Sequence, residues 1–175
     1  MKLKKEFFQR NPETVAEELL GKILVRNING KEFYAKIVET EAYYDDKDPA
    51  SRACKNGDLK ETMKMSGGII LVYGVHDNWL VNIVTGKKGK AEAVLIRAVE
   101  PINFSLRCNG PGLLTHCLKI DKRFHKQKII NNNEIWIEES NDKFEIGKSF
   151  RIGVTKDLKR HLRFFIKDNK YVSRK

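Results

Sequence analysis

The feature that most constrains the fold is a series of short segments rich in branched and aromatic residues, separated mostly by turns rather than by helices. Val, Ile, Tyr, Phe and Thr favour strands, and parallel strands need long crossover connections that usually contain a helix. Few strand pairs here are joined by a helical segment. We therefore expect an α+β fold with a mixed or antiparallel sheet. The expected strands are 22–27, 31–40, 69–73, 79–84, 92–99, 134–138, 149–154 and 162–167.

Local signals place two helices and one tight turn. Asn11 is a preferred capping residue for a helix that begins at Pro12 and ends near Gly21. The pair Asn29-Gly30 is typical of a two-residue hairpin turn. Pro111-Gly112 precedes a short helix over 113–119, whereas 45–60 is polar and irregular and predicts a long loop of the kind that is often functional.

The second strand carries two acidic residues at its end. Side chains on a strand alternate between faces with a period of two residues. Phe33, Ala35 and Ile37 are therefore expected on one face, and Glu39 and Glu41 are expected to continue that face. A carboxylate at a strand end is ordinarily just solvated, so this pattern alone is weak evidence for catalysis.

The net charge of the chain is +11, and the charge is unevenly distributed. Residues 119–175 hold 16 basic and 8 acidic residues. A basic surface indicates a polyanionic partner, most simply nucleic acid, but charge alone does not exclude a merely solvated surface. The 175 residues contain no linker or repeat, so we expect a single domain over 1–175.

Several function classes lack their motifs. The sequence contains no GxSxG, GxxxxGK[ST] or HExxH pattern, and its four histidines lack metal-ligand spacing. No run reaches the roughly 18 apolar residues that a membrane span needs, so no membrane association is expected. Cys54, Cys108 and Cys117 form an odd set without CxxC spacing, which argues against a disulfide framework or zinc site and fits a reducing compartment.

An arginine interrupts the apolar run 94–101. A buried arginine must be paired, and Arg97 could pair structurally with Glu100 or with Glu39. Its functional alternative is to orient an acid or a water molecule. The segment 37–43, with Glu39 and Glu41, is the most distinctive place for such a site.

Several motifs occur together in a recognisable order. They are 16–25 (AEELLGKILV), 37–43 (IVETEAY), Tyr73-Gly74, 82–85 (NIVT), 95–101 (LIRAVEP), 109–111 (NGP), 151–154 (RIGV) and 162–164 (LRF). With them the chain resembles the alkyladenine (3-methyladenine) DNA glycosylase family from about Phe7 to Phe165. Any one motif is weak, but the ordered set is specific. The resemblance implies one DNA glycosylase domain with a curved, mainly antiparallel sheet and surrounding short helices.

The resemblance also implies catalytic roles. Glu41 matches the family's general base, and Arg97 and the backbone of Val154 match the groups that hold the nucleophilic water. A carboxylate near the sugar can stabilise its developing positive charge and take a proton from water. One carboxylate and one held water suffice, so we expect no metal and no organic cofactor.

Further residues match the family's base pocket and its contact with double-stranded DNA. Tyr43 matches an aromatic that stacks on the flipped base, and Asn82 matches a pocket residue that screens purine substituents. Tyr73 matches a tyrosine wedged into the gap that the flipped nucleotide leaves. Two positions depart from the pattern: Arg52 stands where the family usually has a histidine, and Ile70 stands where it has a second stacking tyrosine.

Two functions are therefore compared. The first is a monofunctional glycosylase that releases alkylated purines such as 3-methyladenine and 7-methylguanine from DNA and leaves an abasic site. The second is a damage-binding or RNA-binding module that keeps the basic surface without turnover, which Arg52 and Ile70 would favour. Glu41 and Arg97 favour the enzyme. We expect it to act as a monomer in the cytoplasm, on the nucleoid.

Overall fold

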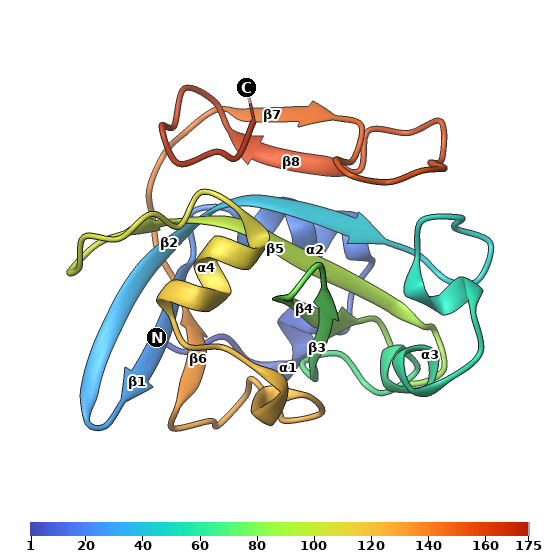
Figure 1. The fold of residues 1–175 in the computed structure, drawn as a ribbon, viewed down its shortest axis with the longest axis horizontal. Helices are drawn as coiled ribbons and strands as arrows, with labels where there is room; N and C mark the ends of the chain where they lie inside the picture. Colours follow the sequence, from blue (N-terminus) through green and yellow to red (C-terminus); the bar gives the residue numbers. More distant parts are fainter. Residues whose placement is uncertain (175) are drawn as a thin grey trace.

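A curled antiparallel sheet forms the centre of the computed structural model, which describes residues 1–174 (Figure 1). The strand order is β3-β4-β5-β2-β1-β6, and β8 pairs with both β2 and β7. Every strand pair is antiparallel, as expected from the turn-rich sequence. The strands are β1 Ile23–Ile28, β2 Lys31–Tyr43, β3 Ile70–Val75, β4 Asn78–Thr85, β5 Glu92–Pro101, β6 Ile135–Glu138, β7 Ile146–Ser149 and β8 Arg163–Ile166.

Short helices surround the sheet, so the expected α+β class and single domain with a curved antiparallel sheet are confirmed. Helix α2 packs against β2 and β5, and α4 packs against β4 and β5. No helix in residues 1–174 is long and apolar enough to cross a membrane. The helices are α1 Lys5–Phe8, α2 Pro12–Leu19, α3 Asp58–Met63 and α4 Pro111–Cys117, with short 3-10 turns at Arg52–Cys54 and Lys122–Phe124.

The local signals for the first helix and hairpin are confirmed. The side chain of Asn11 accepts a hydrogen bond from the backbone N–H of Glu13 (2.9 Å), which caps α2 at its Pro12 start. Gly21, just after this helix, has φ +80°. Asn29 and Gly30 both have positive φ, as a two-residue turn between β1 and β2 requires.

Of two further predictions of local structure, one is confirmed in large part and one is wrong. The segment 45–60 is mostly irregular, as expected, although it contains the turn Arg52–Cys54 and the start of α3. The segment 149–154 is not a strand: β7 ends at Ser149, and the chain then leaves the sheet. The reason is tertiary, because the Arg151 side chain is drawn into a buried ion pair with Asp48.

The predicted face of Glu39 and Glu41 is also wrong. Ala35 and Ile37 belong to the main core, but a bulge at Val38 shifts the register between β2 and β5. After the bulge the even-numbered residues face the core, and the Thr40 hydroxyl donates to the Ala16 carbonyl on α2 (2.7 Å). The two glutamates are thereby turned to the opposite face, where β3, β4 and β5 present their own side chains.

Candidate functional site

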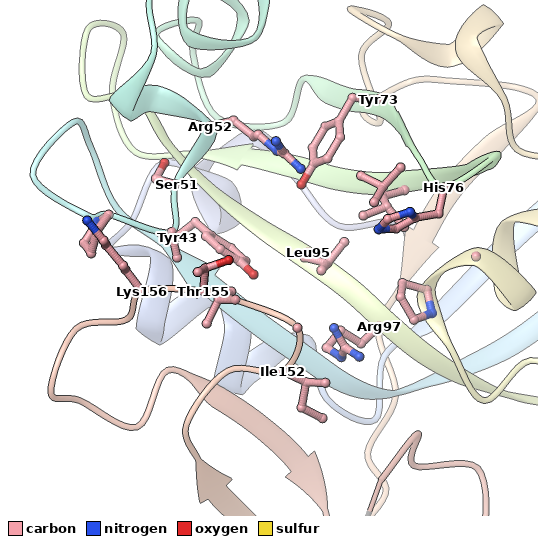
Figure 2. Close-up of a pocket in the computed structure, with 18 of the residues that line it drawn as sticks. Tyr43, Ser51, Arg52, Tyr73, His76, Leu95, Arg97, Ile152, Thr155 and Lys156 are labelled. Atoms are coloured by element: carbon pink, nitrogen blue, oxygen red, sulfur yellow. The ribbon is translucent and has the colours of Figure 1, made fainter.

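One face of the sheet forms the floor of a cavity of about 670 Å³, within the range of about 300–1,000 Å³ typical of ligand pockets. Tyr43 on β2, Leu95 and Arg97 on β5, and Tyr73 on β3 reach it from three strands (Figure 2). The loop 152–156, which follows β7, closes another side. The site therefore depends on strand register rather than on residues near one another in sequence.

Glu41 lies directly behind this lining and has no solvent-exposed surface. The Tyr43 hydroxyl donates to its Oε2 (2.7 Å), and the backbone N–H of Ile152 donates to its Oε1 (2.8 Å). Arg97 Nη1 lies 3.5 Å from the same Oε1. A carboxylate has about four acceptor positions, so these contacts fix the group and leave room for one more donor.

The environment of Glu41 acts on its pKa in two directions. Burial raises the pKa of this carboxyl, because a low-dielectric surrounding disfavours the charged form. The Arg97 guanidinium, the Ile152 N–H and the Tyr43 hydroxyl each oppose that rise, while the nearby Glu39 adds to it. Burial and the Glu41 carboxylate raise the pKa of Tyr43 well above its usual value, so its hydroxyl stays protonated and keeps donating.

Glu39 is the second buried carboxylate of this cluster. Arg97 Nε donates to its Oε1 (3.1 Å), which settles the sequence alternative of Glu100 or Glu39 in favour of Glu39. Arg163 on β8 donates to the same oxygen through Nε (2.7 Å). Arg97 thus touches both glutamates, and it also lines the cavity.

A separate cluster of charged residues joins the loop after β2 to the loop after β7, close to Tyr43. Arg151 makes a bidentate pair with Asp48, both bonds being 2.7 Å, and also binds Asp157. Burial is the largest single influence and would raise the pKa of Asp48, but the hydrogen bonds and charge of Arg151, together with the backbone N–H groups of Tyr44 and Ala50, hold that pKa below its usual value. The Arg151 guanidinium also lies 4.5 Å from the centre of the Tyr43 ring. Tyr43 is therefore fixed from behind as well as through its hydroxyl.

Sequence reasoning missed the roles of Asp48, Arg151 and Ile152. Arg151 and Ile152 lie inside the quoted motif 151–154, which was the available signal for this segment. Nothing in the sequence pairs Arg151 with Asp48, since 103 positions separate them. The predicted backbone group, Val154, lines the cavity, but the N–H that binds Glu41 belongs to Ile152.

Two predicted pocket residues do not line the cavity. Ile70 is fully buried in the main core, and it pairs with Ile83. It stands three residues before Tyr73, so strand alternation places it on the opposite face. Its assignment as a substrate contact is therefore wrong. Asn82 pairs with Leu95 on the cavity face, but it is only 2% exposed and donates to the Leu71 carbonyl (3.3 Å).

Arg52 and Tyr73 form one unit at the cavity edge. The Arg52 guanidinium lies 4.7 Å from the centre of the Tyr73 ring, and both residues line the cavity (Figure 2). Lys55, Lys156 and Arg174 also line it, so its rim is basic. Within residues 1–174, no cluster of His, Cys, Asp and Glu is arranged to hold a metal ion.

Comparison with known proteins identifies the family. The family model described as Methylpurine-DNA glycosylase (MPG) matches residues 6–170. A protein named "Putative 3-methyladenine DNA glycosylase" from Borrelia garinii subsp. bavariensis is 42% identical, over 97% of this chain and 98% of its own length. Proteins with the same name from Aeropyrum pernix (38%; 98% and 93% of the two chains) and Natranaerobius thermophilus (37%; 99% of each) are also similar. The chain therefore belongs to the methylpurine-DNA glycosylase family of DNA glycosylases.

Proposed function

We propose that this protein flips an alkylated purine, such as 3-methyladenine or 7-methylguanine, out of double-stranded DNA and hydrolyses its N-glycosidic bond with a water activated by Glu41. The observation that carries the proposal is the placement of Glu41, an immobilised carboxylate directly behind the floor of a cavity large enough for a base. Family membership supports the reaction class.

The reaction needs only water and the chain's own groups. The water oxygen forms a bond to C1′ as the bond between C1′ and the purine nitrogen breaks, and the departing base takes that electron pair. A base alkylated at N3 or N7 is cationic and leaves as a neutral molecule. Glu41 accepts the proton lost by the water, and its negative charge stabilises the positive charge that develops on the sugar.

Arg97, Tyr43 and the Ile152 N–H make Glu41 suitable as this base. Each favours its ionised form against the effect of burial. They also fix the carboxylate, so that its remaining acceptor position meets a water on the cavity side. The backbone of Val154, which lines the cavity, is the further group that we assign to that water.

Tyr43 and Tyr73 are the aromatic residues for base recognition and flipping. The Arg151 guanidinium covers the Tyr43 ring on one side, and we assign the cavity side of the ring to the flipped base. Stacking of a base on an aromatic contributes about 1–3 kcal/mol. Tyr73 stands at the cavity edge, where its ring would fill the gap in the base stack. Extrusion of the nucleotide costs roughly a few kcal/mol, which these contacts offset.

The basic rim fits the phosphates on either side of a flipped nucleotide. Arg52, Lys55, Lys156 and Arg174 surround the cavity, and the whole chain carries +11. On duplex DNA, each phosphate contact makes the slope of log affinity against log salt concentration more negative by about 0.9. We therefore expect DNA binding to depend strongly on salt concentration. We also expect the protein to act as a monomer.

Arg52 also bears on substrate range. Because Ile70 lies in the core and does not line the cavity, we base the expected substrate range on Arg52 rather than on Ile70. The remaining departure is Arg52, whose cation lies beside the wedge tyrosine. Methylated cationic purines leave readily, whereas neutral hypoxanthine needs more help from the pocket. We expect release of 3-methyladenine and 7-methylguanine and poor release of hypoxanthine.

The test is product analysis on duplexes that contain one lesion. The proposal predicts free 3-methyladenine or 7-methylguanine and an intact strand with an abasic site, which breaks only on treatment with alkali. Treatment with borohydride should trap no covalent complex, because no amine attacks the sugar. Tight, lesion-selective binding without free base would instead assign the chain to the damage-binding class.

A further inference from the structure

The C-terminal segment 167–174 returns to the active site after β8. Ser173 donates two hydrogen bonds to Glu39: its backbone N–H to Oε2 (2.7 Å) and its hydroxyl to Oε1 (2.8 Å). Glu39 has no exposed surface and is otherwise held by Arg97 and Arg163. Among the described residues, Ser173 supplies the one hydrogen bond recorded for Oε2 of this carboxylate.

The segment is fixed along its length rather than resting loosely on the surface. Asn169 donates to Glu100 (2.9 Å), and Val172 is packed in the main core. Arg163 Nη2 donates to the Arg174 carbonyl (2.5 Å). Figure 1 shows the segment that follows β8 turning back beside the β7–β8 hairpin. Several independent contacts therefore hold Ser173 next to Glu39.

Glu39 in turn determines where the guanidinium of Arg97 lies. The carboxylate binds Nε, which is one edge of the planar group, and this leaves Nη1 directed at Glu41, 3.5 Å away. A rotation of Glu39 would move Nε and carry Nη1 with it. Ser173, Glu39, Arg97 and Glu41 thus form one connected series of contacts from the C-terminal segment to the proposed base.

We propose that Ser173 is a positioning residue, which holds Glu39 so that Arg97 stays aligned with Glu41. The inference rests on the proposed function, because it assumes that Glu41 is the base. Without the Ser173 hydroxyl, Oε1 of Glu39 keeps its two arginine donors and loses the one donor on the side of the C-terminal segment, so the carboxylate shifts toward its arginines while the Ser173 N–H still binds Oε2. Arg97 then moves relative to Glu41, and the proposed base loses part of the interaction that keeps it ionised.

This displacement has a kinetic signature that a purely structural role lacks. The charged and polar groups around Glu41 are Arg97 on β5, Tyr43 and Glu39 on β2, and the Ile152 N–H after β7. Arg97 lowers the pKa of Glu41, so a misplaced Arg97 lets that pKa rise. Excision requires ionised Glu41, and the acidic limb of the pH–rate profile therefore moves to higher pH.

The experiment is single-turnover excision of 7-methylguanine from pH 5 to 9 by the full chain. Ser173→Ala should lower the rate at pH 6 about fivefold and shift the acidic limb upward, and Ser173→Thr, which keeps the hydroxyl, should restore both. A chain truncated after Val172 loses both donors and should show a larger effect. Ser149→Ala removes a hydroxyl that binds Arg163 and leaves all donors to Glu39 in place, so its profile should match the wild type.

The outcomes separate this inference from the proposed function. If Ser173→Ala is folded, as judged by its melting temperature, and has the wild-type rate and profile, the positioning role is wrong, whether or not the truncated chain folds. An equal, pH-independent loss in Ser173→Ala and Ser149→Ala would also overturn it. Glu41→Gln is measured in the same experiment. Normal excision by this variant would show that Glu41 is not the base, and the proposed function would fail. If the variant is inactive, the Ser173→Ala result tests only the positioning role of Ser173.

Discussion

Replacement of Arg97 by methionine tests the electrostatics of the buried cluster. The substitution keeps an apolar side chain of similar reach but removes the cation between Glu39 and Glu41. Breaking a buried ion pair by removing one partner costs about 3–5 kcal/mol. Glu39 keeps Arg163 and Ser173, and Glu41 keeps Tyr43 and Ile152. We therefore expect Arg97→Met to lower the unfolding free energy at pH 7.5 by about 3 kcal/mol, the lower end of this range.

The loss of unfolding free energy caused by Arg97→Met should become smaller as pH falls. Burial raises the folded-state pKa of Glu41, so between its unfolded and folded pKa values the folded chain binds a proton that the unfolded chain has released. Stability therefore decreases as pH rises through that window, by at most about 1.4 kcal/mol per pH unit for one group. Arg97 lowers the pKa of Glu41, and its removal extends the window upward. The cost of Arg97→Met at pH 5 should be clearly smaller than at pH 7.5.

The assay is urea denaturation of both chains at the two pH values, with Arg123→Met as the matched control. The Arg123 side chain is 69% exposed, and its pair with Asp121 lies at the surface. Exposed pairs contribute about 0–1 kcal/mol, so the control should change little. A cost below 1 kcal/mol for Arg97→Met, or the same cost at both pH values, would refute the reasoning.

Three further predictions concern activity. Tyr43→Phe removes the hydroxyl that lowers the pKa of Glu41, so single-turnover rates should fall about tenfold at pH 6 and recover toward high pH; a pH-independent loss would contradict this. Tyr73→Ala should weaken binding to lesion duplexes more than to undamaged duplex in titrations, and an equal loss would make Tyr73 merely structural. Arg52→Gln should raise 7-methylguanine release relative to hypoxanthine by up to about tenfold, which corresponds to about 1.4 kcal/mol in the barrier, because it removes a cation at the cavity edge that repels a cationic base; an unchanged ratio in competition assays would argue against repulsion.

Local sequence signals predicted the elements well where short-range chemistry decides the structure. The Asn11 cap, the Asn29-Gly30 turn and the antiparallel arrangement follow from capping, positive φ and short connections. That Arg97 pairs with a carboxylate also followed, because a buried arginine needs a partner, and Glu39 was one of the two candidates. These inferences depend on a few neighbouring residues or on one strong physical requirement.

The remaining features depend on contacts between distant parts of the chain. The bulge at Val38 breaks the period of two and turns Glu39 and Glu41 to the other face, and no residue type in that strand announces it. Ile70 was assigned to the base pocket because it stands three residues before Tyr73, but strand alternation puts its side chain in the core. Arg151 with Asp48, and Ser173 with Glu39, are pairs that only the folded structure brings together.

The most direct test of the central claim compares excision and binding by Glu41→Gln on the same duplex containing 7-methylguanine. The amide keeps the size of the side chain and removes the charge that accepts the proton. We predict single-turnover excision at least about a thousandfold slower than wild type, which corresponds to about 4 kcal/mol in the barrier, with a dissociation constant within a few-fold of wild type. Excision at a near-wild-type rate by a folded Glu41→Gln would contradict it.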